Sequence, residues 1–212
     1  MDTASIINQC LMAIGEEDPS APVEMTRADV LQLINIFYQN EIGKRLKTLA
    51  VYTYDGSDSA HTITDGVGTL PPDFLAPHRV YDGEPHDKNA LEQIFDIEDK
   101  VADTNKTIRF MLPDLAEIWI FGKTPSNTIK LYYYKKPVAL TDSSASAPTA
   151  LKEDYHVDPF VFHIKEIYAA RCGDLADLFD LKVLKLDVLD AIKAAHTSEK
   201  RGNPRRRIKR VG

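Results

Sequence analysis

The spacing of apolar residues changes twice along this chain, and these changes limit its possible folds more than any single motif. Residues 3–48 carry apolar side chains at helical spacing, with a capping-box pattern at Thr26-Arg27-Ala28-Asp29. Short β-branched and aromatic runs begin at Leu49 and end at Pro137. Helical spacing returns from Asp154. We therefore expect helices at both ends of the chain and strands between them.

The N-terminal and C-terminal stretches are each predicted to form two amphipathic helices, which cannot bury their apolar sides alone. The first pair is predicted over residues 3–14, ended by Gly15, and from Thr26 to Thr48. The predicted fold is α+β, with a four-helix core formed by the N- and C-terminal helices and a central antiparallel β insertion. Its segments are the N-terminal helices (1–48), the β insertion (49–140), a flexible linker (141–150), the C-terminal helices (151–197) and a basic C-terminal arm (198–212).

Three local patterns refine this outline. Asp82-Gly83 predicts a two-residue turn in a hairpin over Arg79–Pro85. Residues 89–99 have the pattern of a short helix, whose apolar face would be Leu91, Ile94 and Phe95. The last helix, which follows a break at Gly173, is predicted to have one apolar stripe, made of Leu175, Leu178, Phe179, Val183, Leu186, Leu189 and Ile192.

The stretch Leu70-Pro71-Pro72-Asp73-Phe74 interrupts the predicted strands. Two prolines fix φ and remove two backbone donors, so this stretch cannot lie inside a central strand or a helix. We expect a rigid, extended corner in which Leu70 and Phe74 are buried anchors.

The net charge of −6 hides an asymmetry between the body and the tail. Residues 198–212 hold seven basic residues and one acidic residue, which leaves 19 basic and 31 acidic residues in the rest of the chain. The basic arm can neutralise phosphates, lie in an acidic groove of a protein with Ile208 and Val211 as apolar contacts, or simply keep the chain in solution.

Few residues suggest metal binding, base stacking or catalysis. His78, Asp82, Glu84, His86 and Asp87 can be interpreted as metal ligands or as a polar hairpin tip, and the hairpin tip is favoured. His163 and Glu166, with His156 nearby, are interpreted as a solvated helix face rather than a metal site. Trp119 and Tyr132-Tyr133-Tyr134 can stack on bases, but alternation along a strand favours sheet packing. Cys10 and Cys172 are expected to be buried thiols. We expect no catalytic residue, metal or cofactor.

Neither a membrane span nor a secretion signal is expected. The apolar runs are interrupted by charge before the ~20 residues that a span needs. Met1-Asp2-Thr3-Ala4 lacks the basic start of a signal peptide.

The order of segments resembles the head–tail adaptor (connector) proteins of tailed bacteriophages. The resemblance runs from about Val30 to Ile192 and includes the helical stretch Val30-Leu31-Gln32-Leu33-Ile34-Asn35 and the Leu70–Phe74 corner. It continues through the matching segments Arg79–Pro85, Gly122-Lys123-Thr124-Pro125, Leu131-Tyr132-Tyr133-Tyr134-Lys135-Lys136-Pro137 and Leu151-Lys152-Glu153-Asp154-Tyr155-His156. Residues 96–106 and the basic tail depart from it.

The resemblance implies a structural virion protein rather than an enzyme. Such proteins form dodecameric rings beneath the portal, bind the portal above and tail or nozzle proteins below, and let DNA pass without sequence-specific contact. It implies assembly from protein made in the host cytoplasm. We expect the chain to be monomeric alone and to form a ring on the portal, because a flexible arm that orders on binding delays assembly. The resemblance also implies that the arm docks on the portal, through Arg201, Arg205, Arg206, Arg207, Ile208, Lys209 and Arg210.

Two other functions remain open at this point. A nucleic-acid-binding regulator would use the basic arm to grip a duplex, with affinity that falls as salt rises. A metal-dependent enzyme would use the loop from His78 to Asp87.

Overall fold

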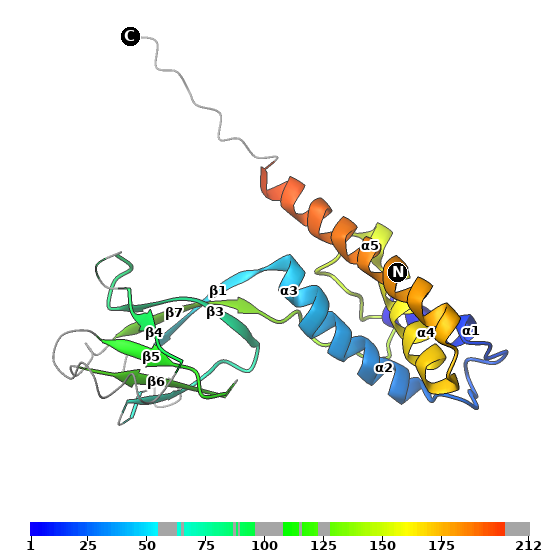
Figure 1. Ribbon diagram of the computed structural model, residues 1–212, viewed down its shortest axis with the longest axis horizontal. Coiled ribbons are helices and arrows are strands. Elements are labelled where there is room, and N and C mark those ends of the chain that lie inside the picture. The colour runs from blue at the N-terminus through cyan, green and yellow to red at the C-terminus, as the bar shows by residue number, and fades with distance from the viewer. Residues whose placement is uncertain are drawn as a thin grey trace, which may run out of the picture. The chain divides into compact units, whose positions relative to one another are not determined.

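The computed structural model shows an α+β protein with two sheets and divides the chain into two compact units (Figure 1). A helical unit combines Met1–Leu46 with Pro137–Gly212, and a β unit comprises Lys47–Lys136. The structure describes residues 1–54, 63–64, 66–86, 88, 90–95, 108–114, 116–122 and 128–201.

The helical unit begins with two helices whose start signals lie in the sequence. Helix α1 (Thr3–Ala13) is capped by Asp2, whose carboxylate accepts from Ser5 N at 2.9 Å. The chain leaves it at Gly15, where φ is +94°. Helix α2 (Arg27–Ile36) starts with the predicted capping box between Thr26 and Asp29. The two N-terminal helices are therefore confirmed.

The second of these helices is not a uniform α-helix. After α2 the chain passes through a π-helical segment, η1 (Phe37–Ile42), and ends in α3 (Gly43–Leu46). Within η1 the adjacent rings of Phe37 and Tyr38 are both buried, with their centroids 6.1 and 5.9 Å from that of Phe160. The apolar pattern predicts the length of this helix but not its π-helical segment, in which hydrogen bonds span five residues instead of four.

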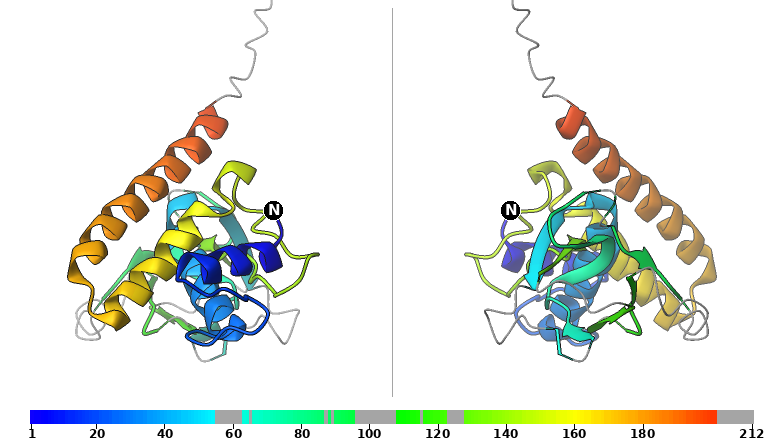
Figure 2. Two further views of the ribbon diagram at one scale, coloured as in Figure 1. Left: turned by 90° about the vertical axis from the view of Figure 1, so that its right-hand side faces the viewer. Right: turned by 90° about the vertical axis from the view of Figure 1, so that its left-hand side faces the viewer.

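The C-terminal helices follow a short 3₁₀ turn, η4 (Glu153–Tyr155). Helix α4 (Asp158–Cys172) ends at Gly173 with φ of +76°, and α5 (Leu175–Arg201) follows. Helix α4 packs against α1, α2 and α5, and α5 also contacts α3 (Figure 2). The apolar core of the unit includes Ile7, Leu11, Val30, Ile34, Phe37, Tyr38, Ile42, Phe160, Ile164, Leu189 and Ile192.

Residues 141–150 differ from the flexible linker that was expected. They form no helix or strand, but polar contacts attach them to the helical unit. Asp142 accepts two hydrogen bonds from Arg27, at 2.7 and 2.8 Å, and Thr3 Oγ1 donates to the Ser146 carbonyl at 3.0 Å. The guanidinium lowers the pKa of Asp142. Small polar residues thus give a segment that lacks regular structure yet is anchored at several points.

The loop between α1 and α2 is closed by a carboxylate. Glu16 accepts hydrogen bonds from the backbone N–H groups of Val23 at 3.0 Å and Glu24 at 2.6 Å. These bonds stabilise the charged form and lower the pKa of Glu16.

The β unit contains two sheets. The first has the order β1-β7-β3, is antiparallel throughout, and consists of β1 (Leu49–Tyr54), β7 (Ile129–Lys135) and β3 (Phe74–Asp82). The second has the order β2-β6-β5-β4 and consists of β2 (Val67–Thr69), β6 (Glu117–Phe121), β5 (Arg109–Met111) and β4 (Glu92–Gln93). Its outer pair, β4 and β5, is parallel, so the insertion is not wholly antiparallel.

Two predictions in the β unit are wrong. Residues 90–95 form β4 and a bridge from Ala90 to Tyr81, not a helix, because Ile94 N donates to Phe110 O in the sheet. Asn89 and residues 96–99 lie outside the described part. The two-residue hairpin is also wrong, because β3 pairs with β7 and Glu84–Pro85 adds no returning strand.

Candidate interaction surfaces

The Leu70–Phe74 stretch joins β2 to β3 in the β unit. Leu70 N donates to Ala116 O at 2.7 Å, and Phe74 N donates back to Pro71 O at 2.9 Å. The second bond spans three residues, so the stretch is a closed turn rather than the extended corner that was expected. Leu70, Pro71 and Phe74 are buried, whereas Pro72 is exposed.

Asp73 ties this turn to β7. Its Oδ1 accepts from the Tyr133 hydroxyl at 2.7 Å, and its carbonyl accepts from Lys136 N at 2.7 Å. The rings of Phe74 and Tyr133 stack with centroids 5.7 Å apart and planes at 29°. Burial and the Asp73 carboxylate both raise the pKa of Tyr133. The turn is thus held by the core of the β unit.

A polar group inside the helical unit joins α5 to α4. Lys185 of α5 forms an ion pair with Glu166 of α4, and both side chains are largely buried. The Lys185 Nζ atom also lies 5.7 Å from the centroid of the Phe37 ring. The Phe37 ring stacks on the His163 imidazole, with centroids 4.2 Å apart and planes at 10°. The expectation that His163 and Glu166 form a solvated face is therefore wrong, because α5 and η1 cover them.

His163 is held in its neutral form. Burial, and secondarily the charge of Lys185, lower its pKa from 6.5 to about 4. Its Nδ1 atom is buried and has no hydrogen-bond partner among the described residues. His163 is a packing residue of the helical unit.

This burial makes the stability of the helical unit depend on pH. Between pH 6.5 and about 4, the unfolded chain binds a proton at His163 while the folded chain does not. Stability should therefore fall as the pH decreases through this window. The variant His163→Gln should show a flatter dependence in denaturant unfolding at a series of pH values. An equal slope in both proteins would contradict a buried neutral His163.

Helix α5 has two apolar faces instead of the single stripe that was expected. Leu181, Leu189 and Ile192 are buried on one face. Phe179, Val183 and Leu186 remain exposed over 69, 43 and 50% of their surface. Helix α5 packs on its neighbours through one side only, so the exposed residues and the buried residues lie on different faces. The sequence already contains evidence for a second apolar face, because Leu181 and Val188 are apolar but are not part of the predicted stripe.

The predicted portal-binding residues follow this helix. Arg201 ends α5, and Arg205, Arg206, Arg207, Ile208, Lys209 and Arg210 lie outside the described residues. Their role therefore stays a prediction.

Three of the candidate metal residues, His78, Glu84 and His86, contact other residues. His78 lies against Tyr134, Glu84 pairs with Lys130 at 2.7 Å, and His86 Nδ1 accepts from Lys88 N. Asp82 ends β3, and Asp87 lies outside the described residues. No group of three or more His, Cys, Asp or Glu in the described part is arranged to hold a metal ion.

The candidate stacking aromatics pack within the β unit. Tyr133 is buried, whereas Tyr132 packs on Tyr81 with ring centroids 5.6 Å apart. Trp119 contacts Phe121 and donates from Nε1 to Glu117 at 2.9 Å. The packing interpretation is confirmed for these rings. The thiols differ from each other: Cys10 is buried and its pKa is raised to about 12, whereas Cys172 is exposed, contrary to expectation.

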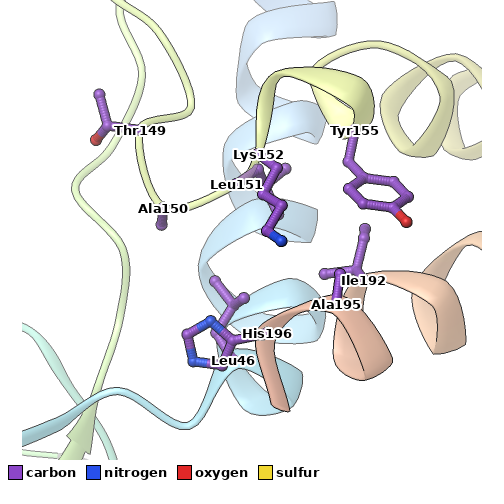
Figure 3. A pocket seen from close by; sticks show the side chains of 9 residues that line it. All are labelled: Leu46, Thr149, Ala150, Leu151, Lys152, Tyr155, Ile192, Ala195 and His196. Atoms are coloured by element: carbon purple, nitrogen blue, oxygen red, sulfur yellow. The ribbon is translucent and has the colours of Figure 1, made fainter. Parts of the chain in front are cut away.

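A pocket of about 220 Å³ opens in the helical unit. Its walls come from the end of α3, the segment before α4 and the last turns of α5 (Figure 3). The lining residues are Leu46, Thr149, Ala150, Leu151, Lys152, Tyr155, Ile192, Ala195 and His196. The polar side chains among them are Thr149, Lys152, Tyr155 and His196.

The comparison with known protein families shows to which family this chain belongs. Residues 1–177 match the SU10 adaptor protein family. This chain belongs to that family. The resemblance to phage head–tail adaptors is therefore confirmed at the level of the family. No curated protein matches the sequence.

Membership of the SU10 adaptor family identifies the chain as a structural phage adaptor and a virion component. The match ends at residue 177, near the start of α5. The exposed face of α5 and the basic arm of this SU10-family adaptor therefore lie beyond it. No helix in the described part has an apolar stretch long enough to cross a membrane.

Proposed function

We propose that this chain is a head-to-tail adaptor that forms a ring, of the dodecameric kind implied by the resemblance, between the portal and the tail. The ring surrounds the channel through which DNA leaves the capsid. The family match over residues 1–177 carries this proposal. The proposed partners are the portal protein on one side and tail or nozzle proteins on the other.

The charge distribution supports different roles for residues 1–197 and residues 198–212 in this ring. Residues 1–197 have 31 acidic and 19 basic residues, so they repel a DNA backbone that passes nearby and do not retain it. Residues 198–212 have the opposite sign and provide an attachment to an acidic surface. We assign portal binding to this arm, with Ile208 as an apolar contact among the arginines.

Removal of the arm tests this assignment. A chain that lacks residues 199–212 should lose detectable binding to a purified portal ring, measured by co-sedimentation. The matched control keeps the length of the arm but replaces Ile208 with Ser, which should weaken binding without abolishing it. Undiminished binding by the truncated chain would show that the arm is not the portal-binding segment.

The nucleic-acid-binding alternative gives a different result in a simple titration. It requires that the isolated chain bind labelled duplex DNA tightly, with affinity that falls steeply between two salt concentrations. The adaptor needs only weak, sequence-independent binding. Fluorescence anisotropy of a short duplex distinguishes the two, and tight binding lost on arm deletion would favour the regulator.

A further inference from the structure

The outward face of α5 carries an apolar stripe that no described part of its own unit covers. Phe179, Val183 and Leu186 are four and then three residues apart, which places them on one side of the helix. Single exposed apolar residues are common on protein surfaces, but a row of them on one helix marks a contact surface.

Charges of opposite sign border the two edges of this stripe. At about 100° per residue, Asp180 and Asp187 fall along one edge, while Lys182 and Lys193 fall along the other. All four side chains are exposed, and within the described part of the chain none forms an ion pair. Asp190 differs, because it pairs with Arg45 at 3.1 Å. The stripe therefore has an acidic edge and a basic edge that are both available to a partner.

We propose that this face of α5 is a contact between copies of this chain, in which the aspartate edge of one copy meets the lysine edge of the next. The inference rests on the proposed ring and names the surface that builds it. Each copy uses two different edges, so the contact runs head to tail and can repeat until the ring closes. Val183 lies next to the aspartate edge and Leu186 next to the lysine edge, so these two side chains of adjacent copies meet beside the charged pairs.

The presence of one acidic edge and one basic edge favours a second copy of this chain over another partner. A DNA backbone would be repelled by Asp180 and Asp187. A partner surface of one sign would leave one edge facing like charge, which costs several kcal/mol at an interface. In a row of α5 helices, each edge of a copy faces the opposite sign on the neighbour at that side.

Charge reversal on one edge tests the contact. Asp180→Lys with Asp187→Lys makes both edges basic, and Lys182→Asp with Lys193→Asp makes both acidic. Each double variant should assemble into rings at least about tenfold less than the wild type, because like charges would meet at every contact. An equimolar mixture of the two variants should restore assembly, since alternating copies again present opposite edges. Sedimentation velocity and electron microscopy, with and without portal rings, measure the assembly.

A second pair of variants addresses the apolar stripe. Phe179→Ser with Leu186→Ser should also reduce assembly. Val23→Ser removes an even more exposed apolar side chain from the loop between α1 and α2, and should leave assembly unchanged. Circular dichroism should show the same helix content in every variant, because all the replaced side chains are exposed.

The outcomes separate this inference from the proposed function. Rings that form equally well in the charge-reversed variants, or a mixture that fails to assemble, would overturn the α5 contact while the adaptor function stands. Variants that keep the ring but lose portal binding would assign the face to the portal and overturn the contact. A wild-type chain that forms no ring in either condition would overturn the proposed function, and this inference with it.

Discussion

Replacement of Phe74 by alanine is expected to lower the free energy of unfolding of the β unit by about 3–5 kcal/mol. The Phe74 side chain is only 1% exposed and stacks on Tyr133, which in turn donates to Asp73. The shortened side chain would leave a cavity beneath the turn that starts β3. Neighbouring backbone cannot close over it easily, because Pro71 and Pro72 restrict the turn.

Urea unfolding followed by tryptophan fluorescence measures this loss. Trp119 is the one tryptophan of the chain and lies on β6 of the same unit. Phe95→Ala is the matched control, since the same atoms are removed from a side chain that is 84% exposed. It should change stability by less than about 0.5 kcal/mol. A similarly small loss at Phe74 would mean that the turn does not depend on this ring.

The second large effect is expected from Lys185→Met in the helical unit. The change leaves the Glu166 carboxylate largely buried and without its partner from α5. Removal of one member of a buried ion pair costs about 3–5 kcal/mol, because the remaining charge keeps its desolvation penalty. Chemical unfolding followed by far-UV circular dichroism should show this loss. Lys44→Met, at an exposed position of α3, is the control and should have little effect.

A double variant shows whether the loss comes from the stranded charge. In Lys185→Met with Glu166→Gln, the residue left behind is neutral, so part of the stability should return. Equal stability of the single and double variants would mean that Lys185 acts through packing, including its contact with the Phe37 ring, and not through the carboxylate.

The sequence predicts the helical ends of this chain well because local signals are strong there. The Thr26–Asp29 capping box and Gly173 mark helix boundaries that do not depend on distant residues. The segment at 90–95 fails for the opposite reason. Leu91 and Ile94 suit a helix locally, but pairing with β5 decides the structure, and that partner lies beyond residue 107.

The interaction surfaces were predicted less completely than the fold. Periodicity identifies α5 as amphipathic, yet it cannot say which of two apolar faces finds a partner in the same chain. Phe179 and Leu189 look alike in the sequence, and only the position of α4 and α3 separates them. Burial of Lys185 was missed for the same reason, since a lysine on a helix is ordinarily solvated.

The helical unit is assembled from two stretches of chain separated by residues 47–136, and this bears on the order of folding during synthesis. The β unit is continuous, so it can complete its sheets once Lys136 has left the ribosome. Helices α1 and α2 emerge earlier but must wait for α4 and α5 to cover their apolar sides. Nascent chains will therefore expose Ile7, Leu11, Val30 and Ile34 until the last helices have been synthesised.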